Sequence, residues 1–477
     1  MNTSPSRIGD LLLPARREFL RDAGLGFGAL ALASLLGDES RGNTSSGVAT
    51  PASLPHHPPK AKRVIWLFMT GAPSQVDTWD YKPELQARNG QPLPGADSQV
   101  GFFQTSGKCL ASPFKWAQHG QSGTWVSDLF PHLSKHVDDM CFIHSMHTDI
   151  PEHAGAILMM NLGHLQPNRP SLGSWLVYGL GTENQNLPGF VALSPRAQPR
   201  GQQANWGNSF LPGAYAGCYV NIQQMRPESV LQDLKNQFVS NGSQRQQVDL
   251  LRQLNRLHAD RARNESALES RIAAMEMAFR MQFSVPEAFD LAGETQATHA
   301  LYGDSEYAKG CLLARRLIER GVRVVQLSLS INDYDIAWDT GHDNIEGGHA
   351  ELARACDQGI AALMIDLKQR GLWDDTLLVW GGEFGRAPTS EGQKGRDHDH
   401  YGFTHWLAGG GVKGGLSYGA TDEFGLSAVE NRVHVHDLHA TILHLLGLNH
   451  EQLTYRYSGR DYRLTDVHGQ VIHDVLA

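Results

Sequence analysis

The feature that most constrains this chain is a short apolar run that ends in glycines and then in acids and histidines. The run Thr376–Trp380 is typical of a buried strand, and it leads into GGEFGR at 381–386 and then into GRDHDH at 395–400. An α/β sheet presents its chemistry in this way, because the loops at the carboxyl ends of its parallel strands meet at one edge. The pattern therefore favours a parallel α/β sheet that carries a metal-dependent hydrolase site.

Composition supports a large folded protein and argues against nucleic acid as a partner. Of the 477 residues, 41% are hydrophobic and 19% are charged, which suits a globular protein with a large core and excludes a disordered or fibrous one. The net charge is -9, and no basic run extends beyond 60–63, so we expect no nucleic-acid binding. Five cysteines without CxxC spacing predict neither a zinc knuckle nor a dense disulfide framework.

Residues 1–45 predict an export signal and the start of a linker. The pair Arg16-Arg17 precedes a Gly- and Ala-rich apolar run at 23–36, which resembles a bacterial twin-arginine signal. We therefore expect the twin-arginine translocase as a partner during export, and a periplasmic or cell-envelope location. Membrane anchoring by an uncleaved signal and an ordinary amphipathic helix are the alternatives. A folded domain is expected at 60–477.

Apolar runs and helical spacing predict the order of elements in that domain. A helix at 348–370 lies between two of the predicted strands, and strand-helix-strand at this spacing indicates a parallel βαβ unit. A last helix is expected at 438–446, with Asp437 as its N-cap and Gly447 at its end, after a short strand at 433–436. Apolar residues three and four apart predict a helical insertion at about 240–300. The strands are expected at 64–69, 322–329, 376–380 and 403–408.

The loops after the predicted strands contain the residues that divalent cations prefer as ligands. Carboxylates and imidazoles from distant parts of the sequence can meet at one sheet edge and bind one or two ions of zinc, calcium, magnesium or manganese. A helix cap or a turn is the alternative role for the two aspartates at 77 and 339. The predicted metal ligands are Asp77, Asp339, His342, Glu383, Asp397 and His398.

Two arginines in the same loops can be interpreted in two ways. The planar guanidinium groups of Arg386 and Arg396 can bind the oxygens of a phosphate or sulfate, which would make them catalytic. The alternative is that each arginine clamps a carboxylate and so organises Glu383 and Asp397.

Several motifs resemble those of known families. DLHATILHLLG at 437–447 resembles the closing helix of the alkaline phosphatase and sulfatase superfamily. GAPSQVDTWDYKP from Gly71, WDTGHDN from Trp338, GGEFGRAP from Gly381 and GRDH from Gly395 together resemble the bacterial exported family catalogued as domain of unknown function 1501. This resemblance covers about 60–470. It implies an alkaline-phosphatase-like α/β fold, a three-layer sandwich with a mostly parallel central sheet.

The resemblance also shows where this chain departs from the superfamily. The superfamily places a metal-binding Asp at the end of its first strand, where this chain has Thr70 and Gly71, and Asp77 follows later. The stretch that would hold a Cys or Ser nucleophile begins with His153, so a formylglycine nucleophile is absent. His153 is therefore a catalytic candidate, as a nucleophile or a metal ligand, and the alternative is that it takes no part in the chemistry.

Three functions are compatible with these residues. The first is an exported metal-dependent hydrolase of phosphate or sulfate esters, in which His153, Arg386 and Arg396 take part in catalysis. The second is a catalytically inactive fold that serves as a periplasmic binding or scaffold protein. The third is a sulfatase that acts on polysaccharide, which predicts an aromatic groove containing Trp175, Trp206 and Trp338.

Overall fold

A computed structural model describes residues 55–95, 107–223, 284–330 and 335–477, together with isolated residues between 242 and 253. The predicted signal at 1–45 and most of the predicted insertion at 240–300 lie outside these ranges. The chain divides into two compact units, and the larger one contains all elements named below: Ala49–Asn184, Pro188–Gln224 and Ala288–Ala477. In the ranges that the structure describes, no helix has the length and apolar character needed to cross a bilayer.

A sheet of nine strands forms the centre of this unit. Its order is β12-β4-β11-β8-β1-β7-β5-β6, and β15 also pairs with β4. The run from β8 to β6 is parallel throughout, whereas β11 is antiparallel to both of its neighbours, β8 and β4. The strands are β1 (Arg63–Phe68), β4 (Met140–His147), β5 (Phe190–Ser194), β6 (Cys218–Asn221), β7 (Val324–Ser328), β8 (Thr376–Gly381), β11 (Phe403–Gly409), β12 (Leu416–Tyr418) and β15 (Val433–His434).

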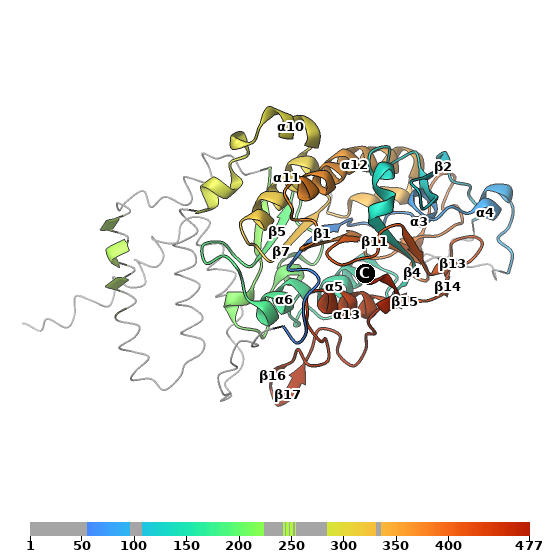
Figure 1. Cartoon of the computed structure of the whole chain (residues 1–477). Helices are drawn as coiled ribbons and strands as arrows, with labels where there is room; N and C mark the ends of the chain where they lie inside the picture. The colour runs from blue at the N-terminus through green and yellow to red at the C-terminus, as the bar shows by residue number, and fades with distance from the viewer. Residues whose placement is uncertain are drawn as a thin grey trace, which may run out of the picture. The chain divides into compact units, whose positions relative to one another are not determined.

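The central strands are almost entirely buried because helices cover both faces of the sheet. All residues of β8, and all but the first of β1, are buried. Figure 1 shows α11 and α12 on one face and α5, α6 and α13 on the other. The prediction of a three-layer α/β fold with a mostly parallel sheet is confirmed. The helices are α5 (His153–Leu162), α6 (Leu172–Leu180), α11 (Glu306–Glu319), α12 (Ile345–Gln369) and α13 (Val435–Leu445).

Short elements lie around this sandwich, and three of them matter for the candidate site. The 3₁₀ helix η6 (Ala337–His342) follows β7, and β9 (Gly385–Arg386) pairs with β10 (His398–Asp399) after β8. In the described ranges, the other α-helices and strands with defined bounds are α3 (Gln75–Thr78), α4 (Pro83–Ala87), β2 (Trp116–His119), β3 (Thr124–Ser127), α10 (Gln296–Tyr302), β13 (Ala420–Thr421), β14 (Ala428–Glu430), β16 (Tyr455–Tyr457) and β17 (Arg460–Tyr462).

The start of α13 differs from its prediction. The N-cap is His434, and Asp437 occupies the third helical position. The Asp437 carboxylate accepts a hydrogen bond from the His434 backbone N–H (2.8 Å), while His434 Nδ1 accepts one from the His436 N–H (3.2 Å). This reciprocal capping box satisfies backbone donors of the first turn. It explains why the helix begins at Val435 and the preceding strand is only two residues long.

Candidate metal centre

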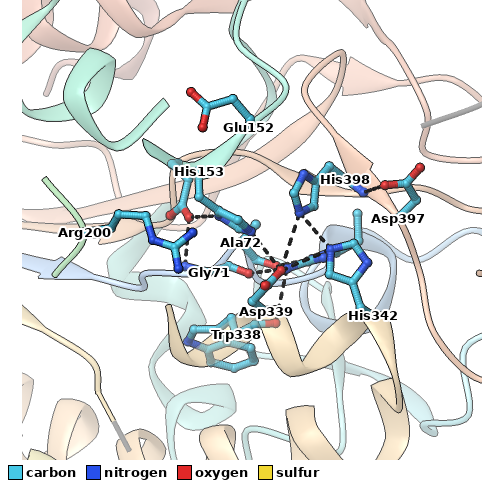
Figure 2. A network of polar contacts seen from close by, with 12 residues as sticks. Gly71, Ala72, Glu152, His153, Arg200, Trp338, Asp339, His342, Asp397 and His398 are labelled. Carbon is cyan, nitrogen blue, oxygen red and sulfur yellow. Dashed lines mark hydrogen bonds and ion pairs between the residues drawn. The ribbon is translucent and has the colours of Figure 1, made fainter. Parts of the chain in front are cut away.

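Four side chains from three separate loops meet at one edge of the sheet, as Figure 2 shows. His153 is the first residue of α5 and follows β4. Asp339 and His342 lie in η6, which follows β7, and His398 begins β10, which follows β8. The strands β4, β7 and β8 run in the same direction, so their carboxyl ends share an edge. We call these four residues the metal centre.

One carboxylate oxygen lies at the middle of the metal centre. Asp339 Oδ1 is 2.8 Å from Nε2 of His153, 3.2 Å from Nε2 of His342 and 3.4 Å from Nε2 of His398. The Nε2 atoms of His342 and His398 are 2.8 Å apart. One ligand atom from each residue lies within 4.8 Å of all the others. Three ring nitrogens and one carboxylate oxygen therefore point at the same small volume.

The other nitrogen of each imidazole faces an oxygen acceptor. His153 Nδ1 lies 2.5 Å from Glu383 Oε1, His398 Nδ1 lies 2.9 Å from the Pro151 carbonyl oxygen, and His342 Nδ1 contacts the Glu391 carboxylate. An acceptor at Nδ1 favours the tautomer that carries its proton there, which leaves the Nε2 lone pair available. Metal-binding histidines are commonly oriented by such outer contacts.

Arg386 orients the carboxylate of the metal centre. Its Nη2 donates to Asp339 Oδ1 (2.8 Å) and to the Gly71 carbonyl (2.5 Å), and its Nε donates to the Ala72 carbonyl (3.0 Å). The side chain is completely buried. Of the two roles predicted for Arg386, this geometry matches the carboxylate clamp, although the clamped residue is Asp339 rather than Glu383 or Asp397.

Asp77 and Arg396 form a separate buried ion pair outside the metal centre. Arg396 Nε lies 2.7 Å from Asp77 Oδ2 and Nη2 lies 3.2 Å from Oδ1, and neither side chain is exposed. The remaining guanidinium hydrogens go to carbonyl groups, including that of Leu110 at 2.9 Å. Asp77 lies in α3 rather than directly after β1. The structure therefore brings neither residue to the metal centre, where the sequence had predicted a ligand and a catalytic arginine.

Glu383 and Asp397 lie next to the metal centre without being part of it. Glu383 Oε1 also accepts a hydrogen bond from the Gly71 N–H (2.9 Å), and its Oε2 is buried without a hydrogen-bond partner among the residues that the structure describes. Asp397 accepts from the His398 N–H (2.7 Å). It also belongs, with His342 and Glu391, to a second group whose ligand atoms lie within 4.8 Å of one another.

The pKa values of the metal centre follow from burial and from these contacts. Burial lowers the pKa of His398 to about 3, and the hydrogen bond to Asp339 does not offset it. Burial also acts to lower the pKa of His153, but its hydrogen bonds to Asp339 and Glu383 raise the value above the ordinary one. His342 is raised in pKa in the same way by Asp339 and Glu391. Burial acts to raise the pKa of Asp339, but the three histidines hold it far below its usual range.

Two further findings change the candidate site. Glu391 contacts His342 but was not predicted from the sequence. It lies in a turn (residues 391–395) that does not directly follow a strand. Its only signal in the sequence was a carboxylate four residues before the glycine of GRDH. The tryptophans predicted to line an aromatic groove are buried instead. Their exposed fractions are 1% for Trp175, 5% for Trp206 and 0% for Trp338. An aromatic groove for polysaccharide therefore cannot be built from these three rings.

Solved structures with some similarity include a protein of the alkaline phosphatase superfamily, a sulfatase and an alkaline phosphatase. A superfamily protein from Vibrio parahaemolyticus has a TM-score of 0.37 at 10% identity, with 90% of this chain and 76% of that chain covered. The sulfatase PsFucS1 from Pseudoalteromonas sp. has a TM-score of 0.35 at 12% identity, with coverages of 89% and 72%. The TAB5 alkaline phosphatase mutant His 135 Glu, with Mg bound in the M3 site, has a TM-score of 0.36 at 10% identity, with coverages of 82% and 99%. At these scores the likeness assigns no activity.

No curated protein matches this sequence at a significant level. The match to a family is extensive. Residues 61–476 match the family described as "Protein of unknown function (DUF1501)", and the chain belongs to that family.

Proposed function

We propose that this protein is a metal-dependent hydrolase of phosphate or sulfate esters, with its cation held by His153, Asp339, His342 and His398. The observation that carries the proposal is the convergence of three Nε2 atoms on one oxygen of Asp339, at 2.8 to 3.4 Å. Each of these rings has its Nδ1 against an oxygen, so each can present a lone pair to the same ion.

The donor set favours a borderline cation over calcium or magnesium. Calcium takes six to eight oxygen ligands, and magnesium prefers an octahedral oxygen shell with several waters. Three imidazoles and one carboxylate instead suit zinc or a related transition metal. Of the four cations considered from the sequence, we therefore propose zinc first and manganese second.

The proposed mechanism divides the work between the ion and the protein. A bound cation of this kind lowers the pKa of water and polarises an ester oxygen. Glu383 and Glu391 orient two of the imidazoles, and Arg386 fixes Asp339 through the bond at 2.8 Å. Arg386 and Arg396 are fully buried and bonded to protein atoms, so neither contacts the ester in this proposal: Arg386 positions Asp339, and Arg396 has a structural role.

Elemental analysis tests the first part of this proposal. Protein purified without chelators should contain about one equivalent of a borderline divalent metal, and the Asp339→Ala variant should lose it. Asp343→Asn is a matched control, because this exposed aspartate lies four residues further on the same turn and outside the metal centre. Equal metal content in the wild type and Asp339→Ala would contradict the site.

Turnover tests the second part. The metal-loaded protein should hydrolyse p-nitrophenyl phosphate or p-nitrophenyl sulfate, and activity should follow metal content across the variants. Because the amino-terminal sequence suggests export, we propose that the natural ester is met in the periplasm or cell envelope.

A non-catalytic binding or scaffold protein is the second candidate. The observation that favours it is that Arg386 and Arg396, both predicted to be catalytic, are bonded to carboxylates of the protein itself. This function predicts a stable protein that turns over neither ester, whether or not metal is bound, which separates it from the hydrolase.

A further inference from the structure

A partly exposed arginine lies beside the metal centre, in a loop that has no part in the mechanism described so far. Arg200 follows β5, which pairs in parallel with β7, so the loops after these two strands leave the same edge of the sheet. The 3₁₀ helix η3 (Gln202–Trp206) comes directly after this loop and packs against α5, the helix that begins with His153. Figure 2 shows the Arg200 side chain pointing toward the metal centre. Its guanidinium therefore lies at the edge of the proposed active site.

The backbone from which Arg200 extends is held in a defined turn. The buried side chain of Asn205 donates from Nδ2 to the Arg200 carbonyl (2.8 Å). The next residue, Gly201, has a φ of 89°, and a Cβ at this position would lie 2.9 Å from Asn205 Oδ1. Glycine adopts such a left-handed conformation without strain. The turn fixes the base of the side chain, so Arg200 reaches the metal centre from a set direction.

The guanidinium of Arg200 has a partner that a ligand can replace. Its Nε lies 3.1 Å from Asp335 Oδ2 and its Nη2 lies 3.5 Å from Oδ1. The two side chains are 43% and 31% exposed, and an ion pair in contact with solvent contributes little to stability. Within the described ranges, Nη1 has no acceptor. Arg200 can therefore exchange Asp335 for an anion of a bound ligand at small cost.

The charges around the metal centre create a need for such a cation. The carboxylates of Glu383 and Glu391 contact two of its imidazoles, and Asp339 adds a third negative charge. A phosphate or sulfate group would be repelled by these carboxylates. Arg386 and Arg396 cannot offset them at the ester, because both are completely buried and bonded to protein atoms. A partly exposed guanidinium is free to do so.

We propose that Arg200 binds the non-bridging oxygens of the phosphate or sulfate group and thereby selects monoesters over diesters. The inference rests on the proposed function and names the group that binds the anion. A guanidinium binds two oxygens at once through parallel N–H groups. A monoester has three non-bridging oxygens, so two remain for Arg200 when one is bound by the cation. A phosphate diester has only two such oxygens and leaves one. The substrate class is therefore a monoester.

Binding of the anion can be measured without turnover. Inorganic phosphate and inorganic sulfate are titrated separately into the metal-loaded protein by calorimetry, and the metal content of every sample is determined. The wild type should bind at least one of them. Arg200→Ala should bind it about 10- to 100-fold more weakly with unchanged metal content, because charge-assisted hydrogen bonds are lost. Arg200→Lys keeps the charge but not the planar fork, so its affinity should be intermediate.

Arg88→Ala is the matched control. The side chains of Arg88 and Arg200 are 44% and 43% exposed, and each has its Nε 3.1 Å from a carboxylate oxygen. Arg88 caps the end of α4 and does not belong to the loops around the metal centre. The control should bind phosphate or sulfate like the wild type. Equal affinity in the wild type and Arg200→Ala, an equal loss in Arg88→Ala, or binding of neither anion by the metal-loaded wild type would each overturn the proposal.

Kinetics of the metal-loaded protein test the preference for monoesters. In Arg200→Ala, kcat/KM for p-nitrophenyl phosphate should fall about tenfold more than kcat/KM for bis(p-nitrophenyl) phosphate, since the diester offers Arg200 fewer oxygens. An equal fall for both esters, or a wild type that prefers the diester, would overturn the assignment of the substrate class. If the wild type hydrolyses no ester, the proposed function fails, and the titrations with phosphate and sulfate still decide whether Arg200 binds the anion.

Discussion

Two of the buried regions that the structure describes pair a carboxylate with an arginine, and they differ in whether other side chains also point at the carboxylate. In the Asp77–Arg396 pair, the guanidinium is held by both carboxylate oxygens and by backbone carbonyls. Around Asp339, by contrast, three imidazoles turn their Nε2 atoms toward one oxygen. Burial and charge are common to both regions. Only the second has several side-chain nitrogens directed at one carboxylate oxygen, and this convergence is the reason why we propose a functional site there.

The largest effect that separates the regions should come from Arg396→Ala. This change leaves the Asp77 carboxylate buried without its partner, so the free energy of unfolding should fall by about 3–5 kcal/mol. Urea titration of the metal-free protein measures it. A loss below about 1 kcal/mol would mean that the ion pair is not the structural element described here.

His398→Ala should act on metal affinity instead. Removing one of four ligands should weaken zinc binding by more than about 100-fold, beyond the roughly 10- to 100-fold expected for outer contacts. Competition with a chromophoric chelator provides the measurement. His400→Ala, two residues away and outside the metal centre, should bind zinc like the wild type.

Glu383→Gln probes the outer contact of His153. The amide would weaken the hold on the His153 Nδ1 proton, so zinc affinity should fall roughly 10- to 100-fold with the fold intact. The same competition assay applies, with Glu346→Gln as the control on the exposed first turn of α12. An unchanged affinity would show that Glu383 does not tune the ligand.

Acid should weaken metal binding, and the sign follows from the raised pKa values of His153 and His342. A raised pKa favours the protonated ring in the metal-free protein, so binding must release protons and affinity falls as pH falls, about tenfold per unit for each proton. His398, with a pKa of about 3, should release none near neutrality. Calorimetry at pH 7 in buffers of different ionisation enthalpy counts the protons. A count of zero would contradict the assignment.

The smallest effect should come from an exposed ion pair. Arg456 and Asp461 are 3.2 Å apart, but their side chains are 68% and 55% exposed. Solvent screens such a pair, so Arg456→Ala should change the free energy of unfolding by about 0.5 kcal/mol or less and leave zinc affinity unchanged. A loss comparable to that of Arg396→Ala would remove the distinction between buried and exposed pairs.

The centre of the sheet could be predicted from the sequence because strands buried on both faces are rich in consecutive apolar residues. The strands β1, β7 and β8 are mostly apolar and almost entirely buried, and the loops that follow β7 and β8 contained three of the four residues of the metal centre. The sequence singled out His153 by its place in a motif. That His153 is placed to bind a metal could be seen only from the direction of its ring nitrogens in the structure.

Other parts of the site could not be predicted, for identifiable reasons. Asp77 looked like a strand-end carboxylate, but α3 turns it toward Arg396, and a partner 319 residues away leaves no local pattern. A pocket lined by His434, His436, His468 and Asp149 could not be predicted either, because its residues come from three separate segments without regular spacing. Convergence of side chains from distant segments is a property of the tertiary structure.

The distances along the chain between the ligands have a consequence for how the protein matures. His153 and Asp339 are 186 residues apart, and Asp339 and His398 are a further 59 apart. The strands that lead to these residues, β4, β8 and β7, are joined in the sheet through β11 and β1, so a chain in which these five strands have not paired cannot bring all four residues together. Tight metal uptake should therefore signal that the sheet from β4 to β7 has formed, and the rate of uptake during refolding should report that step.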